Sequence, residues 1–64
     1  MSVIVPPEAE NIMGDYPAWE VWTGLNGQWH ARLKGATPPV MVHDDSPAGI
    51  REQIRAWEAA RDRG

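Results

Sequence analysis

The stretch EVWTGLNGQWHARL, residues 20–33, constrains the fold of this chain more than any other feature. Two runs of alternating apolar and polar residues flank Asn26-Gly27, which is the pattern of a β-hairpin. A two-residue turn at Asn26-Gly27 would pair Leu25 with Gln28 and mix apolar and charged side chains on both faces of the hairpin. A three-residue loop, residues 25–27, is also common, and it favours glycine at its last position. We therefore predict the three-residue loop.

The three-residue loop gives the hairpin two chemically distinct faces. A one-residue slip in register exchanges the faces of a strand, so the register that separates apolar from polar side chains is expected to be the stable one. One face carries Trp19, Val21, Thr23, Trp29, Ala31 and Leu33. The other face carries Glu20, Trp22, His30, Arg32 and Lys34.

Residues 39–43, PVMVH, are predicted to form a short third strand after a proline-containing turn. Because side chains alternate along a strand, Val40 and Val42 are expected on the inner face. Met41 and His43 are then expected on the outer face.

Residues 46–62 are predicted to form a helix. Asp45 or Ser46 is expected to cap it, and Pro47 suits its first turn. Gly49 is expected to cost about 1 kcal/mol relative to alanine. Helical spacing places four residues on one mostly apolar stripe of this helix: Ile50, Ile54, Trp57 and Arg61. Opposite charges three residues apart are predicted to form the ion pairs Glu52–Arg55, Arg55–Glu58 and Glu58–Arg61.

These elements predict an α+β fold, a three-stranded antiparallel β-meander with one C-terminal α-helix packed on one face. Residues 1–15 are expected to be a short or disordered N-terminal arm, within which residues 7–13 can form a short helix that stops at Gly14. Residues 16–63 are expected to form a single ββ(β)α domain.

Composition narrows the class of protein. The chain has 64 residues and no cysteine, so its small core cannot rely on disulfides, and its four tryptophans are expected to supply the packing. The net charge of −3 argues against a general nucleic-acid binder, which needs a basic surface. No apolar run approaches the roughly 20 residues of a membrane span, and the N-terminal segment lacks a signal-peptide pattern. We expect a cytoplasmic protein without a membrane partner.

Few residues could support catalysis. His30 and His43 are the only histidines, the residue type that most often serves as a general base, and Ser46 is expected at a helix cap. His30 and His43 with Asp44 or Asp45 could form a metal site if their strands adjoin. Aspartates at a helix start are, however, what the helix dipole favours. The sequence therefore predicts a protein that is not an enzyme, with no catalytic residues, no cofactor and no metal.

The outer face of the sheet is the candidate binding surface. An exposed tryptophan beside a methionine and an arginine has the composition of a protein-binding hot spot. The residues are Glu20, Trp22, His30, Arg32 and Met41. We predict a small regulatory or accessory module that binds another protein or itself, as a homodimer. The N-terminal segment could instead cover Trp22 with Ile12, Met13 or residues 3–5, and the sequence leaves this open.

The alternative prediction is a nucleic-acid-binding module built on the three-stranded sheet. It would use Trp22, His30, Arg32 and Lys34, with bases stacked on Trp22 and with Arg32 and Lys34 near enough to contact phosphates. Glu20 opposes these cations, so a nucleic-acid partner is the lesser prediction.

The segments YPAWEVW and GQWHARL, followed by PPVMV and a charged helix, resemble a group of short bacterial proteins from GC-rich genomes. The likeness covers about residues 14–60 and is carried by Tyr16-Pro17, Trp19, Trp22, Gly27, Trp29, Ala31 and Arg32. The resemblance implies a bacterial source and gives no indication of an activity. The order of three strands and a helix is also similar to AP2-type and phage-integrase arm-binding domains, whose strands are basic, unlike these. It is similar too to the antitoxin half of HicB-type modules, whose Pro-Gly-Cys segment this chain lacks.

Overall fold

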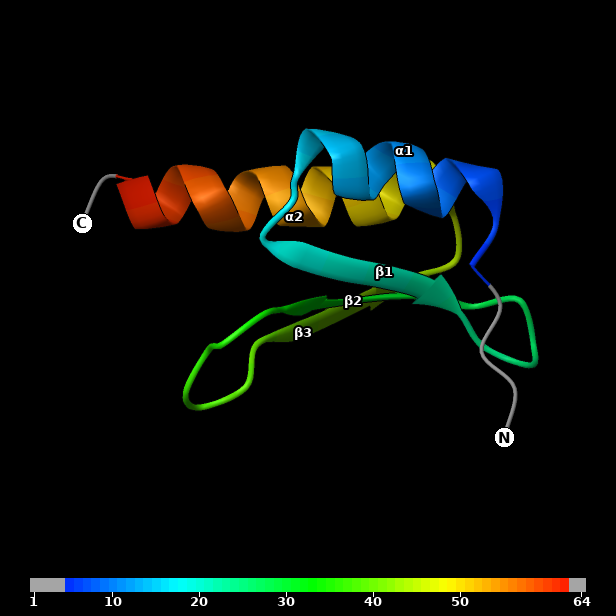
Figure 1. The fold of residues 1–64 in the computed structure, drawn as a ribbon, viewed down its shortest axis with the longest axis horizontal. Helices are drawn as coiled ribbons and strands as arrows, with labels where there is room; N and C mark the ends of the chain where they lie inside the picture. The colour runs from blue at the N-terminus through cyan, green and yellow to red at the C-terminus, as the bar shows by residue number, and fades with distance from the viewer. Residues whose placement is uncertain (1–4, 63–64) are drawn as a thin grey trace.

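The computed structural model describes residues 5–62 as three strands and two helices (Figure 1). The elements are α1 (Pro7–Asp15), β1 (Trp19–Thr23), β2 (Trp29–Leu33), β3 (Met41–Asp44) and α2 (Pro47–Asp62). The strands form one antiparallel sheet in the order β1-β2-β3, as the predicted meander requires. Both helices lie on the same side of this sheet (Figure 1). α1 contacts β1, and α2 contacts β2 and β3. The fold is therefore an α+β sandwich of two layers.

The hairpin register is confirmed. Thr23 pairs with Trp29 and Trp19 pairs with Leu33 across β1 and β2. The Gly24 N–H donates to the Gln28 carbonyl at 2.8 Å, which leaves residues 25–27 as the loop. The last loop residue, Gly27, has φ +77°, the left-handed conformation that glycine adopts without strain. The glycine at the last loop position and the separation of apolar from polar side chains thus both favour the observed register.

The prediction of a single helix is wrong, because α1 is a second helix within the expected N-terminal arm. It runs through Gly14 to Asp15, two residues beyond the expected end at residue 13. Ala9 and Ile12, one turn apart, are both fully buried against the sheet. A helix of nine residues is marginal in isolation and takes its stability from such tertiary burial. The local sequence therefore gave only a weak indication of it.

The core lies between the helices and the inner face of the sheet. The sheet contributes Trp19, Val21, Trp29, Ala31 and Leu33, and the helices contribute Ala9, Ile12, Ile50 and Ile54. Trp19 is 0% exposed, and its Nε1–H donates to a Glu58 carboxylate oxygen at 3.0 Å. A buried indole N–H needs such an acceptor. Trp57 meets the Trp19 ring edge-on, with centroids 5.5 Å apart and an interplanar angle of 85°. The predicted helix stripe is confirmed in its buried members, Ile50 and Ile54.

The connection from β3 to α2 contains a compact cap. Ser46, one of the two predicted caps, accepts the Gly49 N–H on its Oγ at 3.1 Å. The Asp44 carboxylate accepts the Ser46 N–H at 3.2 Å and the Gln53 side-chain amide at 3.1 Å. It lies so close to α2 that a Cβ built on Gly49 would be 2.1 Å from its Oδ1. The absence of a side chain at Gly49 makes this contact possible.

β3 begins at Met41, two residues later than predicted. The Val40 carbonyl still accepts the Leu33 N–H at 3.0 Å, but Pro39 has no N–H with which to extend the ladder. Val40 and Val42 still pack against the core, and Met41 is 56% exposed on the outer side. The predicted inner and outer sides of this strand are therefore confirmed.

Candidate functional site

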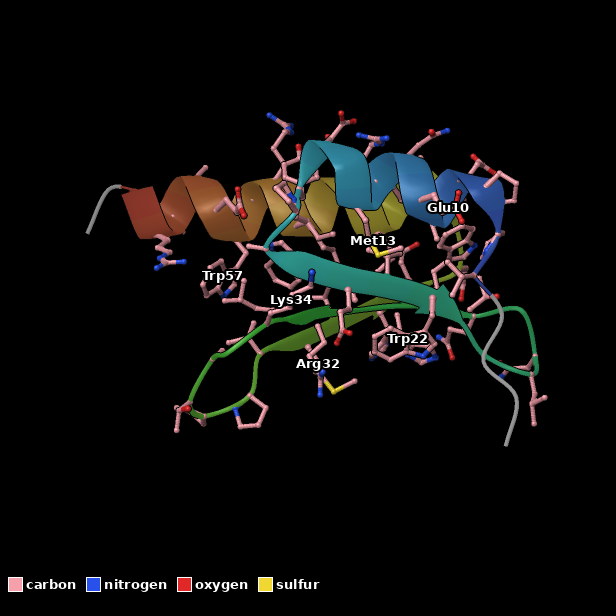
Figure 2. All side chains as sticks on the ribbon, in the orientation of Figure 1. Glu10, Met13, Trp22, Arg32, Lys34 and Trp57 are labelled. Atoms are coloured by element: carbon pink, nitrogen blue, oxygen red, sulfur yellow. The ribbon has the colours of Figure 1, made fainter. Side chains whose placement is uncertain are left out.

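The outer face of the sheet, on the side away from α1 and α2, carries two rows of side chains that run across the strands. Pairing across the three strands aligns Trp22, His30 and His43 in the first row. It aligns Glu20, Arg32 and Met41 in the second. Figure 2 shows Trp22 and Arg32 on this side of the sheet, whereas Met13 lies between α1 and the sheet. The five predicted binding residues thus share one face, together with His43.

The first row is aromatic from one edge of the sheet to the other. The Trp22 and His30 rings are stacked, with centroids 5.6 Å apart and an interplanar angle of 20°. The His43 ring follows at 6.4 Å from His30 with a tilt of 56°. Trp22 and His30 are half-buried, and His43 is exposed. The stacking leaves Trp22 with part of its surface open to solvent.

The second row contains an ion pair and an exposed thioether. Arg32 Nη2 donates to Glu20 Oε1, as their cross-strand register predicts. Because both side chains are exposed, this pair contributes little to stability, but it compensates the positive charge of Arg32. Met41, on β3, pairs with Arg32 of β2. Met41 and Trp22 therefore occupy different rows on opposite edge strands, not neighbouring positions as expected for a single apolar patch.

Trp22 also borders a hollow at the β1 edge. This hollow has a volume of about 380 Å³, and its apolar lining includes Val5, Met13 and Trp22. Of the groups expected to cover Trp22, Ile12 is buried in the core on the other side of the sheet, and Met13 reaches the hollow. Val3 and Ile4 lie outside the described residues. The N-terminal segment within 5–62 therefore borders Trp22 at one edge, and His30 stacks on its face.

Asp44 is not placed with the two histidines. It pairs with Trp29 and so belongs to the inner side of the sheet, whereas His30 and His43 are on the outer face. The Ser46 backbone N–H and the Gln53 amide lower the pKa of the Asp44 carboxyl below its ordinary value of 3.8. Within residues 5–62 no three histidine or carboxylate side chains gather as metal ligands. Asp44 and Ser46 are engaged in capping α2.

A second hollow was not among the predicted sites. It lies between the β2–β3 loop and the C-terminal half of α2, where Lys34, Trp57 and Arg61 line it. The spacing of Trp57 and Arg61, one helical turn apart, was the available signal in the sequence. Helical spacing predicts Trp57 in the core and Arg61 in an ion pair with Glu58. That ion pair is not formed, and Glu58 Oε2 instead accepts the Trp19 indole N–H.

Among the described residues, neither helix has the length and apolar character to cross a membrane. No protein-family model, curated protein or solved structure matches this chain.

Proposed function

We propose that this chain is a non-catalytic protein-interaction module that binds another protein through the outer face of its sheet. One observation supports this above the others. Both helices lie on one side of the sheet, and Trp22 lies on the opposite side (Figure 2). His30 stacks on Trp22, and exposed Met41 shares their face through its pairing with Arg32. Tryptophan, methionine and arginine are enriched at protein interfaces. The Glu20–Arg32 pair would form the polar border of such a contact.

The size of the face favours a foreign protein over a second copy of the chain. Strands about 4.8 Å apart and five residues of about 3.3 Å each give a face of only about 250 Å². A stable interface buries about 800 Å² of surface on each partner. Two copies of the chain that met through this face alone would bury much less than that. A different protein that also extends over the Val5–Met13–Trp22 hollow would gain the additional apolar contact.

The charge on the face favours protein over nucleic acid. Arg32, the cation at its centre, is paired with Glu20, and the chain has a net charge of −3. Nucleic-acid binding requires cations that are free to neutralise phosphates. A regulatory or accessory role in the cytoplasm fits a small module of this kind.

Site-specific photo-crosslinking in the source cells tests the proposal. A photoreactive residue at position 41 is expected to capture a defined protein, and the same residue at position 55, on the exposed surface of α2, is the matched control. Trp22→Ala should reduce capture at position 41 by about tenfold or more, as for a hot-spot residue, with an unchanged circular dichroism spectrum.

Three results would contradict the proposal. Equal capture at positions 41 and 55 would exclude the outer face as the contact. Crosslinks to a second copy of the chain would replace a foreign partner with self-association, and crosslinks to RNA or DNA would favour a nucleic-acid module.

A further inference from the structure

The hollow between the β2–β3 loop and α2 combines an aromatic wall with an apolar lining. Its volume is about 400 Å³, enough for one large side chain. Trp57 forms the wall on the α2 side, and Leu33, Ala36 and Val40 contribute apolar surface from the sheet and the loop. Figure 2 shows Trp57 and Lys34 at the same end of the sheet.

Both charged side chains that line this hollow in the described part of the chain are cations, Lys34 and Arg61. The Arg61 guanidinium carbon is 5.7 Å from the centroid of the Trp57 ring, within cation–π range. Glu58, one turn before Arg61 on α2, accepts the Trp19 indole N–H and is not part of the lining.

Lys34 and Arg61 also differ from the other basic side chains. Arg32, Arg51 and Arg55 each form an ion pair, with Glu20, Asp15 and Glu52 respectively. Within residues 5–62, Lys34 and Arg61 form no ion pair, and both border the same hollow. In a chain with net charge −3, the two uncompensated cations of this part of the chain are thus gathered around one tryptophan.

From this arrangement we infer that the Trp57–Lys34–Arg61 hollow binds an acidic peptide segment of a partner protein. A large apolar side chain of the peptide lies against Trp57, and flanking carboxylates pair with Lys34 and Arg61. The hollow is shallow and open, and a free small molecule needs a site that encloses most of its surface. An extended peptide gains contact beyond the hollow. The inference does not depend on the outer sheet face.

The test is a nuclear magnetic resonance titration of the intact chain with the peptide acetyl-Asp-Glu-Phe-Glu-Asp-amide. The Trp57 indole N–H and the amides of the 34–40 loop are expected to shift in a saturable way at peptide concentrations up to about 1 mM, the range of a weak contact. The double substitution Lys34→Gln/Arg61→Gln should weaken binding by roughly 3- to 30-fold, as expected for two exposed ion pairs. Both positions are exposed, so the fold should persist.

The matched control is Arg51→Gln/Arg55→Gln, which removes the same charge from α2 away from the hollow. It should leave the affinity within about twofold of the original. Equal weakening by this control would overturn the inference, because net charge alone would explain binding. The absence of saturable shifts, or equal binding of a Lys/Arg version of the peptide, would also overturn it. Equal binding of acetyl-phenylalanine would replace the peptide with a small carboxylate as the ligand.

Discussion

The two faces of the sheet use the same residue type for opposite purposes. On the inner face Trp19 is fully buried and bonded through its indole nitrogen, whereas Trp22, three residues later, is half-buried against a histidine on the outer face. The side on which each indole lies is decided by the loop at residues 25–27, since a slip of one residue would exchange them. The number of tryptophans in a small domain therefore does not measure the size of its core. Register determines which indoles stabilise the fold.

The largest expected effect comes from Trp19→Ala. Removing a buried tryptophan costs about 3–5 kcal/mol, and a single core of this size rarely supplies more than about 3–5 kcal/mol. The variant should therefore be unfolded at 25 °C, as measured by far-ultraviolet circular dichroism and urea titration. Trp22→Ala is the matched control and should lose only about 0.2–1 kcal/mol, the value of a cross-strand pair. Similar losses in both variants would contradict the distinction between the faces.

Gly49→Ala should lower the free energy of unfolding by about 1–3 kcal/mol, the usual cost of overpacking. Helix propensity alone favours alanine, but the new Cβ would meet the Asp44 carboxylate at 2.1 Å. Gly14→Ala is the control, because a Cβ there has no atom within 4 Å and should stabilise α1 by up to about 1 kcal/mol. Urea midpoints of the two variants should move in opposite directions. A stabilising Gly49→Ala would exclude the close contact.

The Asp44 carboxylate is expected to make the free energy of unfolding depend on pH. Its pKa is lowered in the folded state, by the Ser46 N–H first and the Gln53 amide second. This contribution to stability is therefore fully present above the ordinary value of 3.8 and is lost as the pH falls below it. Asp44→Asn should flatten the dependence of stability on pH below about pH 4. Thermal unfolding between pH 2 and pH 6 provides the measurement.

The smallest effect is expected on the outer face, from Arg32→Gln. The Glu20–Arg32 pair is exposed, so its loss should cost about 0.2–1 kcal/mol. The difference should shrink at about 1 M salt, where charges are screened within about 3 Å. A loss above about 2 kcal/mol in a urea titration would show that the outer face stabilises the fold more than its exposure indicates.

The sequence was sufficient where local chemistry decides the structure. The hairpin register follows from alternation and from a glycine at the end of a three-residue loop, and both are visible in residues 19–33. The α2 stripe and the Glu20–Arg32 pairing follow from spacing in the same way. The five candidate binding residues accordingly share one face, although register across β3 separates Met41 from Trp22.

The sequence was insufficient where a distant group decides. The stability of α1 depends on burying Ala9 and Ile12 against the sheet, which no local pattern specifies. The role of Gly49 depends on the Asp44 carboxylate, which lies against the first turn of α2. Glu58, the expected partner of Arg61, instead bonds to Trp19, 39 residues away in the sequence.

The edge-on contact between Trp57 and Trp19 has an evolutionary consequence. A substitution at position 57 that suited a different peptide would also uncover the central indole, so selection for stability restricts change there. Divergence in ligand preference is expected instead at the rim, where Lys34 and Arg61 can vary without loss of the fold. Related chains should therefore keep the tryptophan and differ in the charges around it.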